Sequence, residues 1–342
     1  MKARLEGMDR MIERIVKKAL AGEKIDQNEL AELFGLSPFV KESALILAAG
    51  REMSQKACNY RAEVHAQVGL DISPCPRNCK FCSFAARNKI FRENIELPVE
   101  EVRHKAKGFE TDGANAVYLM ATAQYPFEKF LEVGQEIKKI LNPETILIAN
   151  VDDFSKKQAH QLKDAGFFGV YHALRLGEGK DSTILPSKRL ETFRNVKEAG
   201  LVLGTCLEPM GPEHTIEELV EKTIITREAE PVYSGAARRI PIPNTELSQY
   251  GWVSELRMAH ILAVVRLALG YVIPGNCTHE PNSLGAAAGA NLFWAETGSN
   301  PRDTEKETEG KRGMAVLDCK KVFREAEWEV LEGPSAFYAG ES

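Results

Sequence analysis

The chain has 342 residues, of which 44% are hydrophobic, so it can bury a large core as one barrel or as two domains. Its net charge of -5 disfavours a nucleic-acid-binding surface, and in a reducing compartment its seven cysteines favour metal chemistry over disulfide bonds. No apolar run approaches a membrane span, and the start Met-Lys-Ala-Arg-Leu-Glu is too charged for a signal peptide, so we expect a cytoplasmic protein without a membrane partner.

The first part of the chain is expected to be helical. Apolar residues recur at helical spacing in three stretches, Met8 to Ile15, Asn28 to Phe34 and Val40 to Ser54. No catalytic motif falls in these stretches. We therefore predict an N-terminal helical cap over residues 1–57, closing one end of a main domain over residues 58–342 that ends in a C-terminal extension.

From Val64 onward, short apolar runs alternate with amphipathic stretches. Eight repeats of strand and then helix imply a parallel sheet, and eight such strands close most naturally into a barrel. The predicted fold is therefore α/β, a (β/α)8 TIM-type barrel. The expected strands are 64–73, 115–121, 145–151, 167–173, 201–207, 232–240, 270–276 and 290–296. The expected helices are 98–110, 127–141, 155–165, 187–199, 215–229, 252–268, 281–288 and 314–329. The charged stretch 301–313 is expected to be an exposed loop.

Three thiols follow the first predicted strand in the pattern Cys75-Pro-Arg-Asn-Cys79-Lys-Phe-Cys82. Prolines at 74 and 76 prevent a regular helix or strand there, and Asn78 tolerates a tight turn. The loop can therefore fold back and direct three sulfur atoms at one point. Such a group suits a soft tetrahedral metal ion or an iron-sulfur cluster.

The missing fourth ligand is informative. A structural zinc site usually has four protein ligands, whereas the next histidine, His104, is far along the chain. An iron-sulfur cubane with three cysteine ligands leaves one iron open for a substrate or cofactor. The alternatives at this point are a zinc knuckle and three unconnected buried cysteines.

The motif, with Phe81 directly before its last cysteine, resembles the signature of radical S-adenosylmethionine (radical SAM) enzymes. The resemblance implies that Cys75, Cys79 and Cys82 hold a [4Fe-4S] cluster and form the catalytic centre. In that family the open iron binds the methionine part of SAM, and one electron cleaves SAM to methionine and a 5'-deoxyadenosyl radical.

In a parallel barrel the functional residues collect after the carboxyl ends of the strands. The resemblance places SAM against Phe81 and against the backbone of Ala121 and Thr122, which follow strand two. It also implies cofactor contacts from Arg175 and Glu178 after strand four. The adenosyl end is expected along the loops after strands four and six. The expected contact there is Ile240.

Other polar residues at the strand ends are candidates for substrate contacts. Asn150 ends strand three, His172 and Glu208 follow strands four and five, and Arg239 suits a carboxylate anchor because a guanidinium binds carboxylates in a bidentate manner. A buried structural role is the alternative for His172. The acids at 152 and 153 are expected to cap the following helix.

Three further cysteines suggest a second centre. Cys206 and Cys277 fall at strand ends, and Cys319 lies in the last predicted helix. Together they either bind an auxiliary iron-sulfur cluster or are ordinary core residues.

Within the superfamily, the chain resembles the branch of biotin synthase, a hydrogenase maturase and methylornithine synthase. Residues 58–296 carry this resemblance, through the cysteine motif, the helix 188–200, the exit Ile240-Pro-Ile-Pro-Asn-Thr245 and the Ala288-Gly-Ala-Asn291 run. Strands two and three carry Tyr118 and Ile148 where biotin synthases of the common type have cluster cysteines.

The resemblance implies hydrogen abstraction from an unactivated C–H bond, followed by sulfur insertion as in biotin or lipoyl formation. The alternatives are a radical rearrangement or fragmentation, and, from another class, a non-enzymatic iron-sulfur electron carrier. The expected partners are a small or carrier-protein-bound substrate and a reductant such as ferredoxin or flavodoxin. A homodimer or a related second subunit is an open alternative to a single chain.

Overall fold

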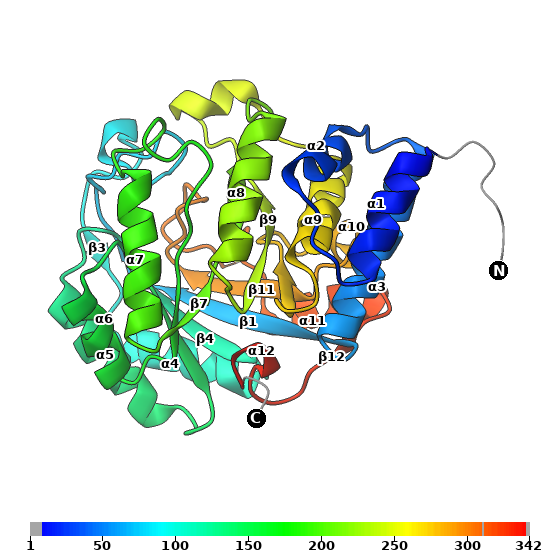
Figure 1. Cartoon of the computed structure of the whole chain (residues 1–342). Coiled ribbons are helices and arrows are strands. Elements are labelled where there is room, and N and C mark those ends of the chain that lie inside the picture. Colours follow the sequence, from blue (N-terminus) through cyan, green and yellow to red (C-terminus); the bar gives the residue numbers. More distant parts are fainter. Residues whose placement is uncertain (1–8, 310, 340–342) are drawn as a thin grey trace.

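Eight parallel strands close into a barrel in the computed structural model, which describes residues 9–309 and 311–339 (Figure 1). The ring closes because β10 pairs with both β9 and β11, and β11 returns to β1. The predicted TIM-type α/β barrel is confirmed. The barrel strands are β1 (Arg61–Gly69), β4 (Ala116–Met120), β5 (Ile146–Asn150), β6 (Gly169–Tyr171), β7 (Val202–Gly204), β9 (Tyr233–Arg238), β10 (Gly275–Cys277) and β11 (Leu292–Gly298). Short β8 (Leu207–Met210) continues β7 after a break and pairs with β9.

Each barrel strand leads to a helix on the outside of the ring (Figure 1). These helices are α4 (Val99–Thr111), α5 (Phe127–Ile140), α6 (Lys156–Asp164), α7 (Pro186–Glu198), α8 (Ile216–Glu228), α9 (Glu255–Leu269), α10 (Ser283–Ala287) and α11 (Val316–Glu325). Thr215 and Glu218 form a capping box that opens α8. The seventh barrel strand begins later than the predicted 270, because Gly270 ends α9 and an apolar turn follows it. None of the helices in the described residues is long and apolar enough to cross a membrane.

The alternation of residues in β1 separates two cores. Val64, Ala66 and Val68 belong to the large apolar layer between the barrel and its helices. The residues between them, among them His65 and Gln67, are buried on the other face of the strand. The barrel interior is therefore partly polar, and its buried polar groups require partners inside the ring.

The C-terminal segment closes the lower end of the barrel (Figure 1). The Glu63 carboxylate accepts hydrogen bonds from the backbone N–H groups of Ala336 (2.8 Å) and Phe337 (3.3 Å), at the start of α12 (Ala336–Ala339). The Tyr338 hydroxyl lies 2.6 Å from the Tyr118 hydroxyl. Short β12 (Glu329–Val330) leads into this segment and pairs with β1. The predicted C-terminal extension thus fills the base of the ring.

The three N-terminal helices lie along one flank of the ring, beside α8 and α9, whereas a cap over one end was expected (Figure 1). The reason is the apolar character of α9, which is buried along almost its whole length and offers an apolar face to α3. Close contact requires Gly50, since a Cβ there would lie 2.9 Å from the Ala263 Cβ. These helices are α1 (Arg10–Leu20), α2 (Gln27–Gly35) and α3 (Lys41–Ala57).

The prediction of an exposed loop over 301–313 is wrong for much of its length. Asp303 and Thr308 are buried. Thr308 N donates to Gly298 O at 2.9 Å, and the Pro301 carbonyl accepts the N–H of Ser83 at 3.0 Å. High charge density indicated exposure, but these hydrogen bonds fold the segment over the barrel mouth beside the cysteine loop.

His260 on α9 makes the attachment of the N-terminal helices sensitive to pH. Its Nε2 lies 2.9 Å from the carbonyl oxygen of Leu33 on α2, and its side chain is fully buried. Burial lowers the pKa of His260 to about 4, although the hydrogen bond to Leu33 opposes this shift. The unfolded chain therefore binds a proton at His260 between about pH 6.5 and 4 that the folded chain does not bind.

We expect this histidine to reduce the free energy of unfolding by about 3 kcal/mol as the pH falls from about 6.5 to 4. A His260→Gln variant should lose that part of the slope in urea unfolding, whereas His160→Gln, at an exposed position on α6, should keep it. Equal slopes for the parent and His260→Gln would contradict the expectation.

Candidate active site and cofactor centres

The C-terminal ends of the barrel strands surround a pocket to which most of the predicted site residues contribute. The predicted residues that line it are Cys75, Cys79, Phe81, Cys82, Ala121, Thr122, Asn150, His172, Arg175, Glu208, Arg239 and Ile240. This placement agrees with the barrel mouth as the expected site of function. Glu178, Cys206, Cys277 and Cys319 are not among its lining residues.

The cysteine loop leaves β2 (Asp71–Ile72) and folds back on itself. Cys75 N donates to the Phe84 carbonyl at 2.7 Å, and the Cys75 carbonyl accepts Ala86 N–H at 3.0 Å. Asn78 adopts a left-handed conformation with φ of 52°, in agreement with the predicted tight turn. The Asn88 amide donates to the carbonyls of Cys79 (3.2 Å) and Cys82 (2.7 Å). These bonds hold the loop closed around its thiols.

The chemistry of these thiols suits an iron-sulfur cluster. Burial raises the pKa of each thiol, to about 11 for Cys79, so thiolates there need positive charge nearby. Iron supplies that charge when thiolates bind it. One metal ion would require the three sulfur atoms to lie close together. In the described part of the chain, the sulfur atoms of these cysteines do not all lie within 4.8 Å of one another. A cubane instead takes its three thiolates on separate irons, and the residues fit it.

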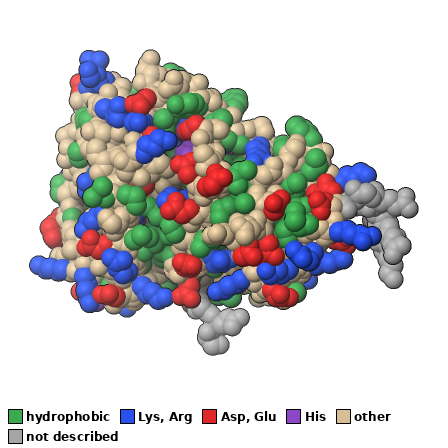
Figure 2. Space-filling view, turned by 45° about the horizontal axis from the view of Figure 1, so that its top comes forward, with side chains coloured by type: hydrophobic (Ala, Val, Ile, Leu, Met, Phe, Trp, Pro, Cys, Tyr) green, Lys and Arg blue, Asp and Glu red, His purple; other side chains and the backbone are tan. Residues whose placement is uncertain are grey.

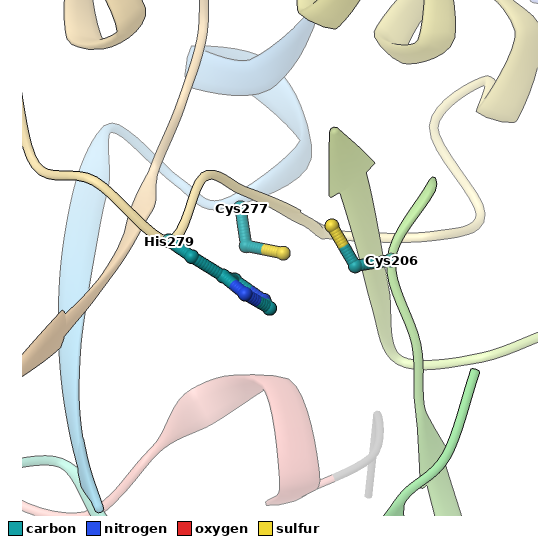
Figure 3. Close-up of side chains that lie close together, drawn as sticks. All are labelled: Cys206, Cys277 and His279. Carbon is teal, nitrogen blue, oxygen red and sulfur yellow. The ribbon is translucent and has the colours of Figure 1, made fainter. Parts of the chain in front are cut away.

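A different set of donors does have the compactness that one metal ion needs. One ligand atom each of Cys206, Cys277 and His279 lies within 4.8 Å of the other two. Figure 3 shows the two sulfur atoms directed toward each other, with the His279 ring beside them. Both cysteines are fully buried, and His279 also lines the pocket at the barrel mouth.

The electrostatics at this second group favour one thiolate. Burial raises the pKa of Cys277, but hydrogen bonds with Cys206 and His279 together outweigh it and lower the pKa to about 6. The pKa of Cys206 is raised well above its usual value, first by burial and then by its neighbour Cys277. A buried thiolate beside a thiol and an imidazole is a donor set that soft metals prefer.

Cys319 does not join this group. It lies on α11 in the apolar layer outside the barrel, where its Sγ lies 3.4 Å from the Trp294 carbonyl. The helix faces the outer side of β11, so the strand separates this thiol from the barrel interior. The structure therefore brings two of the three expected cysteines together, and it adds a histidine that the sequence did not single out.

A family model described as the Radical SAM superfamily matches residues 72–223, which begin just before the cysteine loop. These residues form a radical SAM domain. It is 27% identical over 274 residues to the biotin synthase of Carboxydothermus hydrogenoformans, covering 76% of this chain and 82% of that relative. The biotin synthase of Anaplasma marginale is 28% identical over 283 residues, covering 78% and 85%.

Solved structures of the same branch share the fold. A methylornithine synthase superposes with a TM-score of 0.79 at 17% identity, covering 93% of this chain and 97% of that one. The FeFe-hydrogenase maturase of Carboxydothermus hydrogenoformans gives a TM-score of 0.79 at 19% identity, covering 96% and 81%. The predicted biotin synthase-like branch is confirmed. Because the chain is a radical SAM enzyme, the alternative of a non-enzymatic electron carrier is excluded.

The activity of this radical SAM enzyme is reductive cleavage of SAM and hydrogen abstraction from an unactivated C–H bond. Cys75, Cys79 and Cys82 would hold the [4Fe-4S] cluster, which would supply an open iron for SAM and the electron that cleaves it. The chain contributes a pocket at the barrel mouth, whose side chains limit the access of water to a reactive carbon radical. The Thr122 hydroxyl and N–H both bind the Asp71 carboxylate, at 2.6 and 2.8 Å, so this residue fixes the loop after β4 at the pocket wall.

Two acids that were expected to cap α6 have other partners. Ser155 itself caps α6. Asp152 binds Arg77 of the cysteine loop, and Asp153 lies 2.9 Å from His172 and 3.3 Å from Arg189. Burial raises the pKa of Asp153, but contacts with His172 and Arg189 outweigh it, so the pKa falls below its usual range. The capping prediction is wrong because the acids reach across the barrel mouth.

Arg189 on α7 organises the residues after β6. Its guanidinium lies 3.1 Å from Glu178 and 3.1 Å from His172 Nε2, and the side chain is almost fully buried. Burial and the positive charge of Arg189 lower the pKa of His172. Glu178 therefore supports Arg189 behind the pocket. Arg175, predicted beside it, lines the pocket and lies 3.4 Å from Glu208.

Residues proposed for substrate contacts already have partners inside the protein. Arg239 binds Glu213 through both terminal nitrogens, so a carboxylate substrate would have to displace that acid. Asn150 Nδ2 donates to the Gln67 side chain at 2.8 Å. Glu208 lies 3.1 Å from His279 Nδ1. Of these residues, Glu208 stands where the pocket meets the second donor group.

Several pocket residues had no clear signal in the sequence. Arg302 lies in the charged loop whose position was predicted wrongly, and it pairs with Glu296 of β11 at 2.5 Å. Tyr171 and Trp294 were treated only as strand residues, although both line the pocket. Glu296 and Arg302 could have been identified by treating every polar or aromatic residue at the end of β11 and in the next loop as a candidate.

Replacing one cluster ligand should abolish the chemistry without unfolding the barrel. A Cys79→Ala variant should lose the iron of the SAM-binding cluster and reduce 5'-deoxyadenosine formation to background, because three thiolates are needed to hold the cubane. Cys58→Ala is the control, because Cys58 lies at the end of α3 and outside the pocket. Chromatographic assay of 5'-deoxyadenosine with dithionite as reductant measures the difference, and turnover by Cys79→Ala would contradict the assignment.

Proposed function

We propose that this radical SAM enzyme inserts sulfur into an unactivated C–H bond, using a metal-sulfur centre held by Cys206, Cys277 and His279. The observation that carries the proposal is the compact group of these three residues beside the SAM pocket, in which both cysteines are fully buried. The relatives named biotin synthase, which align over about three quarters of the chain, support it.

The residues fit such a centre. Sulfur ligands at about 2.3 Å from a tetrahedral metal lie roughly 4 Å apart, which is compatible with donor atoms within 4.8 Å. Three protein ligands leave a coordination position for sulfide. A bound iron-sulfur centre supplies sulfide and accepts the electron that remains when a carbon radical forms a C–S bond.

The protein residues around the group position it against the pocket. The Tyr171 hydroxyl lies 3.4 Å from His279 Nε2, and Glu208 holds Nδ1 at 3.1 Å. Burial raises the pKa of Glu208, but His279 and Arg175 outweigh it and the pKa falls, so Glu208 is a carboxylate at neutral pH. That carboxylate orients the imidazole, an arrangement common behind metal-binding histidines.

The substrate we propose is a small molecule or an acyl group on a carrier protein. The electron comes from a reductant of the ferredoxin or flavodoxin type. The enzyme works alone, as a homodimer or with a related second subunit. These three alternatives predict different masses in light scattering of the purified protein.

The test is metal analysis of a variant that cannot bind the first cluster. A variant with Cys75, Cys79 and Cys82 replaced by Ala should retain iron and sulfide after anaerobic reconstitution, and Mössbauer spectroscopy should show that the retained iron has sulfur ligands. Adding Cys206→Ala or Cys277→Ala should remove this remaining iron. Adding Cys319→Ala should not, because Cys319 lies outside the barrel.

The same experiment distinguishes sulfur insertion from the second candidate function. If the triple variant binds no iron, the radical SAM cluster is the protein's iron centre and sulfur insertion is wrong. A radical rearrangement or fragmentation is then the function to pursue. The specific observation in its favour is that β4 and β5 direct Tyr118 and Ile148, and no thiol, into the barrel.

A further inference from the structure

The cysteine loop is unusually basic for a chain with a net charge of -5. Residues 74–92 contain five cations and no acid, and the first acid afterwards is Glu93. Figure 2 shows that basic and acidic side chains are otherwise interspersed over the visible face. The cations of the loop are Arg77, Lys80, Arg87, Lys89 and Arg92.

Three of these cations are neutralised within the protein. Arg77 binds Asp152, Lys80 lies 3.0 Å from Glu246, and Arg87 lies 2.7 Å from the same carboxylate. Glu246 begins the short helix η2 (Glu246–Tyr250), which packs beside the loop. Lys89 and Arg92 are exposed, and no described residue forms an ion pair with either. Two unpaired positive charges therefore remain.

The two free cations line one shallow surface groove that is largely open to solvent. Its other walls are Pro74, Ala86 and Phe91. Ala86 and Lys89 belong to or directly follow the short helix η1 (Ala86–Asn88), and Asn88 is hydrogen-bonded to the carbonyls of Cys79 and Cys82. The groove is thus built on the same folded loop as the cluster ligands.

The groove also contacts the ligand residues from behind. Ala86 N–H donates to the Cys75 carbonyl at 3.0 Å, and Pro74 precedes Cys75 in the chain. The Phe91 ring packs edge-on against Phe84, with 5.8 Å between centroids. Phe84 in turn packs in the apolar cluster that Cys75 and Cys82 contact. A partner in the groove would be separated from the cluster ligands by one layer of residues.

From this arrangement we infer that the groove formed by Pro74, Ala86, Lys89, Phe91 and Arg92 is the docking surface for an acidic one-electron carrier protein. The two unpaired cations attract carboxylates at the rim of the carrier, and Phe91 offers an apolar contact at the centre. Electron-transfer encounters use small interfaces of this kind, and opposite charge mainly raises the rate of encounter. One electron passes from the reduced carrier to the cluster, and no bond forms or breaks.

The test measures SAM cleavage with two different reductants in a variant whose groove has reversed charge. Lys89→Glu combined with Arg92→Glu should lower the rate of 5'-deoxyadenosine formation with reduced flavodoxin on the order of tenfold at low ionic strength. The rate with titanium(III) citrate should not change, because a small reductant needs no docking surface. Added salt should slow the parent with flavodoxin but not the double variant.

A control variant carries the same change in net charge elsewhere. Lys24→Glu with Lys321→Glu alters two exposed lysines on the opposite flank and on α11, and should behave like the parent with both reductants. A reduced 2[4Fe-4S] ferredoxin in place of flavodoxin should give the same pattern, since the surface recognises acidic charge.

The inference is wrong if the groove variant keeps the parental rate with flavodoxin and with ferredoxin. It is also wrong if the rate falls equally with titanium(III) citrate, because the change then acts on the cluster loop itself. SAM cleavage is the readout in every arm, so the result does not depend on whether the enzyme inserts sulfur.

Discussion

Buried polar groups that must find partners inside the barrel are the constraint on which this structure depends. An unpaired buried charge is very costly, and the interior of this ring contains several carboxylates, arginines and histidines. At the base, Glu63 accepts bonds from His65 and from the start of α12. The C-terminal segment therefore satisfies a carboxylate while it closes the ring.

At the barrel mouth, the same need for partners holds the pocket side chains in place before a ligand binds. Arg189 is held between Glu178, Asp153 and His172, and Arg239 is held by Glu213. Such networks keep side chains in one arrangement, so positioning costs little when SAM binds. The loop 301–313 adds Arg302 to this set, and its hydrogen bond to Ser83 links the outer wall to the cluster loop.

The enzyme thus has two groups of soft donors with different geometry. The motif cysteines sit on a loop near the surface, where an electron carrier can approach. Cys206 and Cys277 are buried at the ends of β7 and β10, and His279 beside them lines the pocket. A pocket lies against both, with Glu208 and Tyr171 between the SAM side and the second group. This order suits a reaction in which an electron enters from outside and a sulfur atom is delivered from within.

Local patterns in the sequence predicted the barrel, the order of its elements and the cysteine loop. Period-two and helical periodicity are local signals, and the spacing of Cys75, Cys79 and Cys82 lies within eight residues. Cys206 and Cys277 could also be named, because strand ends share one face of a parallel barrel. That His279 joins them and Cys319 does not follows from the folded arrangement of the strands and helices. The same arrangement also decided that Asp152, Asp153 and Arg302 turn toward the mouth. Those outcomes depend on contacts between residues far apart in the chain, and periodicity carries no information about them.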